Sequence, residues 1–126
     1  MKIAKSPSSK HLLKLTLQSL EDSKAIDVVS INLIGRSSIA DYMIVASGSS
    51  SRQVTSMADN LVKTYKEIGL RPPLPEGMSN GDWVLIDAKD ILIHIFRPEV
   101  RDFYSLEKMW LKNQDETSVD NIQNKI

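Results

Sequence analysis

One stretch decides the fold: DYMIVASGSSSRQVTSMADNLVKTYKEIG, residues 41–69. Its first part, Tyr42–Ala46, is a continuous apolar run with a β-branched centre, which is typical of a strand buried on both faces. Gly48 and the serines after it end the strand, and a serine caps the helix that follows. Gly69 stands where a helix commonly ends. Between these limits, apolar residues recur at helical spacing, at Val54, Met57, Ala58, Leu61, Val62, Tyr65 and Ile68.

The residues before this stretch predict a helix and a strand. Either Ser8 or Ser9 can cap the helix. Its apolar stripe is formed by Leu12, Leu13, Leu17 and Leu20, with Thr16 on the same side. Over Ile26–Leu33, apolar and more polar residues alternate, and a period of two indicates a strand with one face more polar than the other.

The residues after the stretch predict a loop, a hairpin and a last helix. Leu70–Asn80 contains three prolines and is therefore expected to be a loop. Trp83–Ile86 and Ile91–Phe96 are apolar strands, and the four residues between them suit a tight hairpin connection. Pro98 can open the last helix. This helix is expected to carry Val100, Phe103, Tyr104, Leu106, Met109 and Trp110.

The predicted order is helix, strand, strand, helix, strand, strand, helix, which indicates a single α/β domain with a mixed β-sheet and flanking helices. The second strand, the helix after it and the third strand are expected to form a right-handed parallel crossover. The length of 126 residues suffices for one core. We expect a domain over residues 9–111, a flexible N-terminus over residues 1–8, and a polar tail over residues 112–126.

The composition restricts the class of partner. Sixteen basic and sixteen acidic residues give a net charge of zero. Proteins that bind nucleic acid usually carry a basic excess, so direct contact with rRNA is expected to be minor, although a local basic patch stays open. The absence of cysteine excludes thiol nucleophiles and disulfides. No apolar run approaches the roughly 18 residues of a membrane span, so we expect a cytoplasmic protein with no membrane partner.

The junction between the strand and the helix could serve catalysis. Gly48 and Ser49 could hold a phosphate at the helix start, and they resemble the Gly-Ser of nucleotidyltransferases. That chemistry also needs two carboxylates, one residue apart on a following strand, to hold magnesium. Asp59 lies at the expected distance, but it lacks such a partner and falls in a predicted helix. A helix cap is the favoured interpretation, and we predict neither catalytic residues nor a cofactor.

Two further features could bind a metal ion. Asp87 and Asp90 flank the hairpin turn, where aspartate is also common because it hydrogen-bonds the local backbone. His94 lies inside an apolar strand, and the chain has only two histidines, fewer than a zinc site needs. We therefore predict no metal site.

The chain carries more large aromatics near its end than a small sheet needs. They are Trp83, Phe103, Tyr104 and Trp110. Each could be a core residue, but together they predict a protein-binding surface, because Trp, Tyr and Arg dominate interface energies. Arg97, Arg101 and Glu107 could form its polar rim.

Several motifs follow one another in a fixed order. They are DYMIVASG (residues 41–48), SSRQV (50–54), Glu76-Gly77, WVLID (83–87), DILIHIF (90–96) and Arg101-x-x-Tyr104-x-Leu106-Glu107-x-x-Trp110. Their order and spacing resemble the iojap family of ribosomal silencing factors, and the resemblance covers about residues 11 to 110. The sequence departs from the family at Gln53, where many members carry histidine. The tail beyond Trp110 lies outside the resemblance.

The resemblance implies a nucleotidyltransferase-like fold without the catalytic carboxylates. It further implies binding to the large ribosomal subunit through its protein fourteen, which sterically blocks association with the small subunit and represses translation when nutrients run short. Organellar relatives serve large-subunit assembly. On this basis we expect three groups of partner-binding residues. The anchors are Trp83, His94, Arg101, Tyr104 and Trp110. The acids expected to face basic residues of the partner are Glu76, Asp87 and Asp90, and Glu107 is expected on the rim.

Three alternatives stay open at this point. Large-subunit assembly could be the main role. The chain could be a nucleotide-binding or transferase enzyme of the same fold. It could also form a homodimer when free, using the same aromatic surface.

Overall fold

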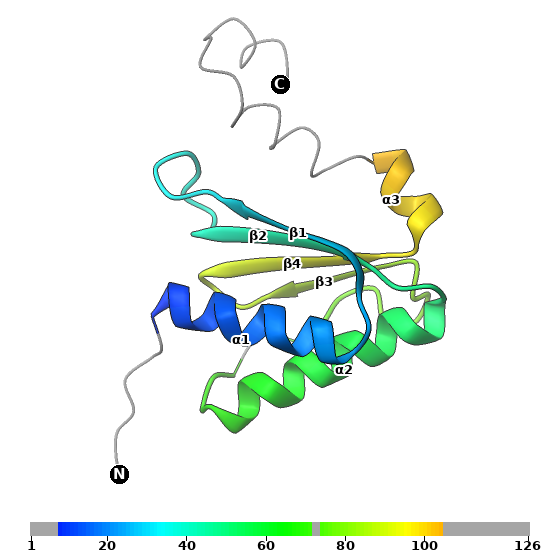
Figure 1. Cartoon of the computed structure of the whole chain (residues 1–126), viewed down its shortest axis with the longest axis horizontal. Helices are drawn as coiled ribbons and strands as arrows, with labels where there is room; N and C mark the ends of the chain where they lie inside the picture. Colours follow the sequence, from blue (N-terminus) through cyan, green and yellow to red (C-terminus); the bar gives the residue numbers. More distant parts are fainter. Residues whose placement is uncertain (1–7, 72–73, 105–126) are drawn as a thin grey trace, which may run out of the picture.

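The structure is a computed structural model, and it describes residues 8–71 and 74–104. Within these residues the elements follow the predicted order. They are α1 (Ser9–Asp22), β1 (Ile26–Asn32), β2 (Tyr42–Ser47), α2 (Ser51–Glu67), β3 (Trp83–Asp87), β4 (Ile91–Phe96) and α3 (Pro98–Tyr104). Helices α1 and α2 lie on one face of the sheet, and α3 lies at one end of the opposite side (Figure 1). The predicted α/β architecture is confirmed.

The sheet is mixed, with strand order β1-β2-β4-β3. Strand β2 is antiparallel to β1 and parallel to β4, and β4 is antiparallel to β3. The expected parallel crossover from β2 to β3 is therefore wrong, because the strand parallel to β2 is β4. The loop after α2 explains this: Gly81 lies against Ser51 at the start of α2, so the chain has returned along the helix before β3 begins.

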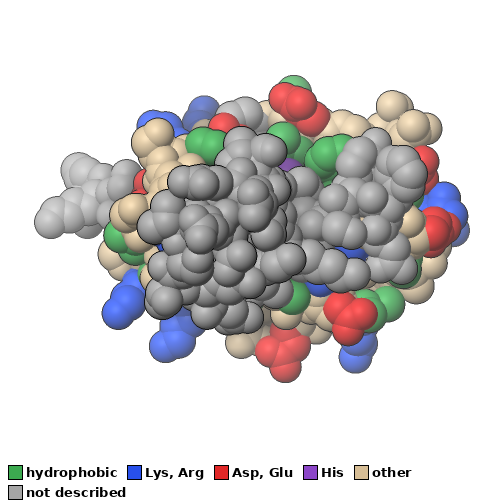
Figure 2. Space-filling view, turned by 90° about the horizontal axis from the view of Figure 1, so that it is seen from above, with side chains coloured by type: hydrophobic (Ala, Val, Ile, Leu, Met, Phe, Trp, Pro, Cys, Tyr) green, Lys and Arg blue, Asp and Glu red, His purple; other side chains and the backbone are tan. Residues whose placement is uncertain are grey.

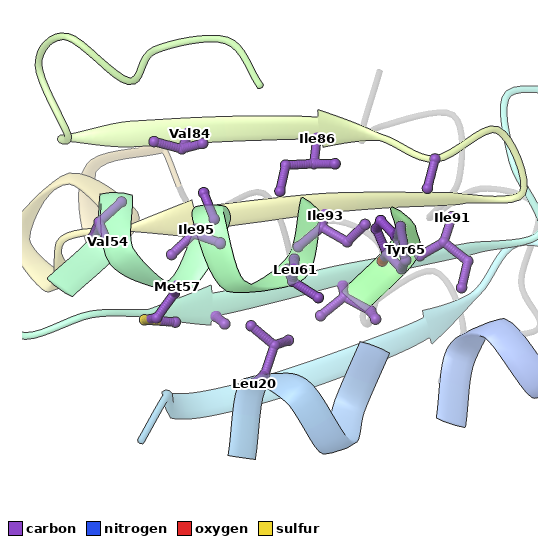
Figure 3. Close-up of a cluster of buried hydrophobic side chains, with 14 of the residues drawn as sticks. Leu20, Val54, Met57, Leu61, Tyr65, Val84, Ile86, Ile91, Ile93 and Ile95 are labelled. Atoms are coloured by element: carbon purple, nitrogen blue, oxygen red, sulfur yellow. The ribbon is translucent and has the colours of Figure 1, made fainter. Parts of the chain in front are cut away.

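The main core lies between the two long helices and the sheet (Figure 3). Helix α2 buries Val54, Met57, Ala58, Leu61 and Tyr65, as its pattern predicts, while Val62 and Ile68 are half-buried. Helix α1 buries Leu12, Thr16, Ser19 and Leu20, whereas Leu13 and Leu17 of the predicted stripe are only partly buried. All six residues of β2 are buried, which confirms a strand covered on both faces.

A buried hydrogen bond joins the two long helices. The Thr16 hydroxyl donates to the Leu12 carbonyl at 2.8 Å, so it can only accept from the Tyr65 hydroxyl, 2.6 Å away. Burial raises the pKa of Tyr65 to about 12, which keeps the phenol protonated as the donor.

The ends of the elements largely follow the sequence. Ser8, one of the two predicted caps, accepts from the His11 N–H and begins α1. Gly69 follows α2 with a φ of 85°, as a glycine after a helix commonly does. Strand β3 includes Asp87, so the connection to β4 is one residue shorter than predicted.

Candidate functional site

The sheet face turned away from α1 and α2 carries the candidate site. Val84 and Ile86 of β3 pack in the helix-side core, so Trp83, Leu85 and Asp87 point to the other side. We call this side the outer face. By strand register its residues are Val29, Ile31, Met43, Val45, Ser47, Trp83, Leu85, Asp87, Leu92, His94 and Phe96. Figure 2 shows the molecule from this side, with hydrophobic side chains and a histidine inward of a rim of charged side chains.

Three rings form a cluster on the outer face. The ring centroid of Trp83 lies 5.0 Å from that of Phe96 and 5.9 Å from that of His94. The indole Nε1 of Trp83 also donates to His94 Nδ1 at 3.0 Å. Burial lowers the pKa of His94 to about 4, so the imidazole is neutral at physiological pH. The structure thus brings together two of the predicted anchor residues, and only Trp83 retains substantial exposure.

A shallow hollow of about 300 Å³ lies beside this cluster, lined by Glu76, Gly77, Trp83 and Leu85. Glu76 forms an isolated bridge with Leu85, with the two backbone hydrogen bonds at 2.9 and 3.0 Å. Directly paired residues project to the same side of a sheet, so the exposed Glu76 carboxylate belongs to the outer face. Gly77 has a φ of 91°, and a Cβ on it would lie 2.1 Å from the Trp83 carbonyl oxygen. The loop therefore approaches β3 too closely for any side chain at position 77.

Arg101 was expected as an anchor on the surface, but the structure buries it to 7% exposure. Its guanidinium donates to the Ser47 hydroxyl at 2.9 Å. Ser47 ends β2 and Arg101 lies in α3, so this bond holds the short helix against the sheet. Nothing in the local sequence signals this pairing, because the two residues are 54 positions apart.

Arg97 lies where β4 passes into α3. It forms an ion pair with Asp82 at 3.0 Å and a second one with Glu99. These two pairs connect the start of β3 with the start of α3. Arg97 therefore pairs with acidic groups of its own chain, whereas the sequence pattern predicted it in the polar rim of a protein-binding surface.

The other two predicted acids lie at the hairpin. The Asp87 carboxylate accepts from the Lys89 N–H at 2.9 Å, the local bond that aspartate commonly makes in a turn. The Asp90 carbonyl accepts from the N–H groups of Asp41 and Tyr42. Both side chains are exposed. Trp83 lies at the opposite end of β3, so the structure does not gather these acids around the hollow.

Four predicted residues cannot be placed. Phe103 and Tyr104 belong to the backbone of α3, but their side chains lie outside what the structure describes, as do Glu107 and Trp110. Their predicted roles stay predictions. Leu85 and Phe96, by contrast, belong to the site and were missed. The period-two pattern of β3 and β4 could have placed both beside Trp83 and His94.

The start of α2 is an ordinary helix cap. The Ser50 hydroxyl accepts from the Gln53 N–H at 3.1 Å, which confirms the cap interpretation of the serine run. Asp59 lies exposed on α2, in a helix as predicted. Over residues 8–71 and 74–104, no three His, Asp or Glu side chains are placed to share a metal ion.

None of the helices in the described part of the chain is both long enough and apolar enough to span a bilayer.

Known proteins resemble this chain over most of its length. The family model described as "Ribosomal silencing factor during starvation" matches residues 6–126. A ribosomal silencing factor of Zymomonas mobilis is 56% identical over 99 residues, which cover 79% of this chain and 74% of that protein. The mouse protein named mitochondrial assembly of ribosomal large subunit protein 1 is 32% identical, covering 81% of this chain and 46% of its own length. A crystal structure of a Chromobacterium violaceum protein superposes with a TM-score of 0.80 at 36% identity, covering 82% of this chain and 87% of that one.

Proposed function

This chain belongs to the family of ribosomal silencing factors, and from that premise we propose that it binds the large ribosomal subunit and blocks association with the small one. The proposed contact is protein fourteen of the large subunit, and the proposed outcome is repression of translation in the cytoplasm when nutrients are limiting. Such a function needs no chemical step. A folded domain bound where the small subunit must dock excludes it by volume, and a typical interface of this kind covers about 800 Å² of each partner.

The observation that carries the proposal is the hollow beside β3. Half-buried Trp83 and Leu85 supply an apolar floor, and the exposed Glu76 carboxylate stands at its rim. Interfaces commonly combine a large aromatic anchor with a polar rim. A basic side chain of the partner could place its aliphatic part on the indole of Trp83 and its charge beside Glu76.

The remaining predicted residues take different roles in this proposal. Asp87 and Asp90 are exposed at the hairpin and would face further basic groups of the partner. His94 and Arg101 are buried, so they would act as positioning residues. His94 orients the Trp83 indole through its hydrogen bond, and Arg101 holds α3. Tyr104, Glu107 and Trp110 are proposed to extend the surface beyond α3.

The direct test is co-sedimentation with large ribosomal subunits purified from Zymomonas mobilis, with the silencing factor of that organism as the positive control. We expect this chain to pellet with large subunits and to reduce the formation of complete ribosomes when small subunits are added. If the control pellets and this chain stays in the supernatant, the proposed function is wrong.

A matched pair of charge reversals tests the location of the contact. Glu76→Lys changes the rim of the hollow, whereas Glu67→Lys makes the same change on the exposed end of α2, on the helix side of the sheet. We expect Glu76→Lys to weaken binding at least about tenfold, the effect of losing a charged contact of about 1.4 kcal/mol. Glu67→Lys should bind as the wild type does. Equal binding by both variants would remove the hollow from the interface.

A second role is favoured by the mouse relative, whose name refers to assembly of the large ribosomal subunit. We propose large-subunit assembly as the alternative function of the same surface. Deletion of the gene separates the two roles. Loss of silencing alone should leave mature large subunits in normal amount, whereas an assembly role predicts that incomplete large particles accumulate during growth in rich medium.

A further inference from the structure

A second hollow lies on the helix side of the sheet, against α1. Its volume is about 420 Å³, and the described residues that line it all belong to one side of α1: Lys10, His11, Leu13, Lys14 and Leu17. We call this hollow the α1 groove. Helix α1 covers the face of the sheet opposite to the outer face (Figure 1), so the α1 groove is separate from the hollow beside β3.

The floor of the α1 groove is apolar. Leu13 and Leu17 are four positions apart, so their side chains lie one above the other on the helix. Both are only partly buried at the margin of the main core, whereas Leu12 and Leu20 of the same helix are fully enclosed in it. The two leucines of the floor therefore present apolar surface that a partner can cover.

The rim of the α1 groove is basic. Lys10, His11 and Lys14 are all exposed. Within residues 8–71 and 74–104, no ion pair joins any of these three side chains to an acidic group. The acids of α1 itself, Glu21 and Asp22, stand at the far end of the helix. The positive charge of the two lysines is thus left for a group from outside the described part of the chain.

The distribution of charge along the sequence supports the same surface. Residues 1–20 contain four of the sixteen basic residues, Lys2, Lys5, Lys10 and Lys14, and none of the sixteen acidic ones. The whole chain has no net charge, so residues 21–126 carry a compensating acidic excess. A basic segment in an otherwise acidic chain indicates a local surface for a partner of negative charge.

We propose that the α1 groove binds an acidic amphipathic helix of another protein. Apolar residues of that helix, at helical spacing, cover Leu13 and Leu17. Carboxylates on the flanks of its apolar strip face Lys10 and Lys14. These lysines are one helical turn apart, so carboxylates spaced by one turn on the partner match them.

The leucines of the floor favour a protein helix over a nucleic acid or a lipid surface. RNA phosphates would pair with the lysines but would offer no apolar group to Leu13 and Leu17. A helix that lies on a bilayer inserts a broad apolar face, and most of the apolar face of α1 is already packed in the core. A narrow apolar strip bordered by lysines suits a single helix with acidic flanks.

Fluorescence anisotropy with a labelled synthetic peptide tests the proposal. The probe is a peptide of about 18 residues with leucines at helical spacing and glutamates on both flanks of the leucine strip. We expect the purified full chain to bind it and Lys14→Glu to raise the dissociation constant at least about tenfold. Lys14 is exposed, so this variant should keep the circular dichroism spectrum of the fold.

Arg52→Glu is the matched control. It makes the same change of charge at an exposed position in the first turn of α2. The neighbouring Gln53 donates to the Ser23 carbonyl just after α1, so this position lies near the end of α1 and away from the groove at its beginning. The Arg52→Glu variant should bind the peptide as the wild type does.

Further probes separate the apolar contact from the charge. A peptide with glutamine in place of every leucine keeps the charge and should not bind. A single-stranded RNA and vesicles containing phosphatidylglycerol represent the two other classes of partner, and both should bind more weakly than the acidic peptide. The proposal is overturned if the acidic peptide does not bind, if Lys14→Glu or the leucine-free peptide binds equally well, or if RNA or vesicles bind more tightly.

Amide chemical shifts locate the contact. Titration with the acidic peptide should shift the signals of residues 10–17 and leave those of Trp83 and Leu85 unchanged. Shifts at Trp83 and Leu85 without shifts in α1 would place the peptide in the hollow beside β3, and the proposal would be wrong. Lys14→Glu should still pellet with large ribosomal subunits, so a failure of this proposal is distinguishable from a failure of the proposed function.

Discussion

The indole Nε1 of Trp83 donates a 3.0 Å hydrogen bond to Nδ1 of His94, on the neighbouring strand. Because Nδ1 accepts this bond, it carries no proton, and the neutral imidazole has its proton on Nε2. Protonation of Nδ1 would replace the acceptor with a second donor and break the bond. The orientation of Trp83, the main residue of the hollow, therefore depends on the charge state of His94.

We predict that the protein loses stability in mild acid through His94. Its pKa is lowered to about 4 in the folded state from 6.5, so the unfolded chain binds the proton more readily. The contribution of neutral His94 to the free energy of unfolding is fully present above about pH 6.5. It is lost as pH falls toward 4, by up to about 3 kcal/mol. Urea denaturation from pH 7 to pH 4 measures it. His94→Asn keeps an acceptor near Nδ1 without titrating and should flatten this dependence.

His11→Asn is the matched control, since it removes the other histidine, which is exposed on α1. It should retain the wild-type pH dependence. If His94→Asn also retains that dependence, another group causes the loss of stability in acid.

The order of elements could be read from the sequence because each depends on local pattern. Tyr42–Ala46 is apolar throughout, and α2 has its apolar residues at helical spacing. The direction of β3 could not be read in this way. The direction of β3 depends on the end of the sheet at which the preceding loop returns. The contact between Gly81 and Ser51 fixes that position, and no local sequence pattern links these two residues.

The candidate site was predictable only in part. Trp83 and Glu76 were expected as contact residues, and the structure places both at one hollow. Arg101 was expected as an interface anchor because arginine often dominates interface energies, but the structure buries it, with a hydrogen bond to Ser47. Such a pairing between distant residues results from the packing of α3 on the sheet. The propensities of single residues cannot predict this packing.

We predict that Gly77→Ala damages both stability and ribosome binding. The new Cβ would lie 2.1 Å from the Trp83 carbonyl oxygen, in addition to the strain of a φ of 91°. The expected loss is about 3 kcal/mol or more in the free energy of unfolding. Gly35→Ala is the matched control, because its φ is 80° but nothing lies within 4 Å of the added atom. It should lose only about 1 kcal/mol. Equal losses would mean that the loop moves freely away from β3.

The hydrogen bond between Thr16 and Tyr65 predicts an asymmetric pair of substitutions. Tyr65→Phe removes the donor but leaves Thr16 bonded to the Leu12 carbonyl, so about 1 kcal/mol should be lost. Thr16→Val leaves the buried Tyr65 hydroxyl without its acceptor and should lose about 2 kcal/mol. The double variant should lose less than the sum, which denaturant titration of all four proteins measures. Strict additivity would contradict the bond.

Gln53 connects the start of α2 with the turn between α1 and β1, and its four hydrogen bonds predict how each replacement should behave. Its Oε1 accepts from the N–H and the hydroxyl of Ser49 at 2.6 and 2.7 Å, and its Nε2 donates to the carbonyls of Ser23 and Lys24 at 3.2 Å each. A neutral histidine offers one donor and one acceptor, so Gln53→His should keep about two of these bonds and lose about 1 kcal/mol. Gln53→Glu keeps the acceptor for Ser49 but turns a carboxylate oxygen toward two carbonyls.

Gln53→Glu should therefore destabilise the fold more than Gln53→His at neutral pH, by about 1 kcal/mol given the partial exposure of the site. The difference should shrink as pH falls, because a protonated carboxyl can again donate to a carbonyl oxygen. Thermal denaturation of the wild type and both variants at pH 7 and at pH 4.5 checks this order. The pH change acts on His94 in all three proteins, so only the difference between the two variants is informative. If the glutamate variant matches the wild type at pH 7, the Gln53 amide does not hold the two segments together.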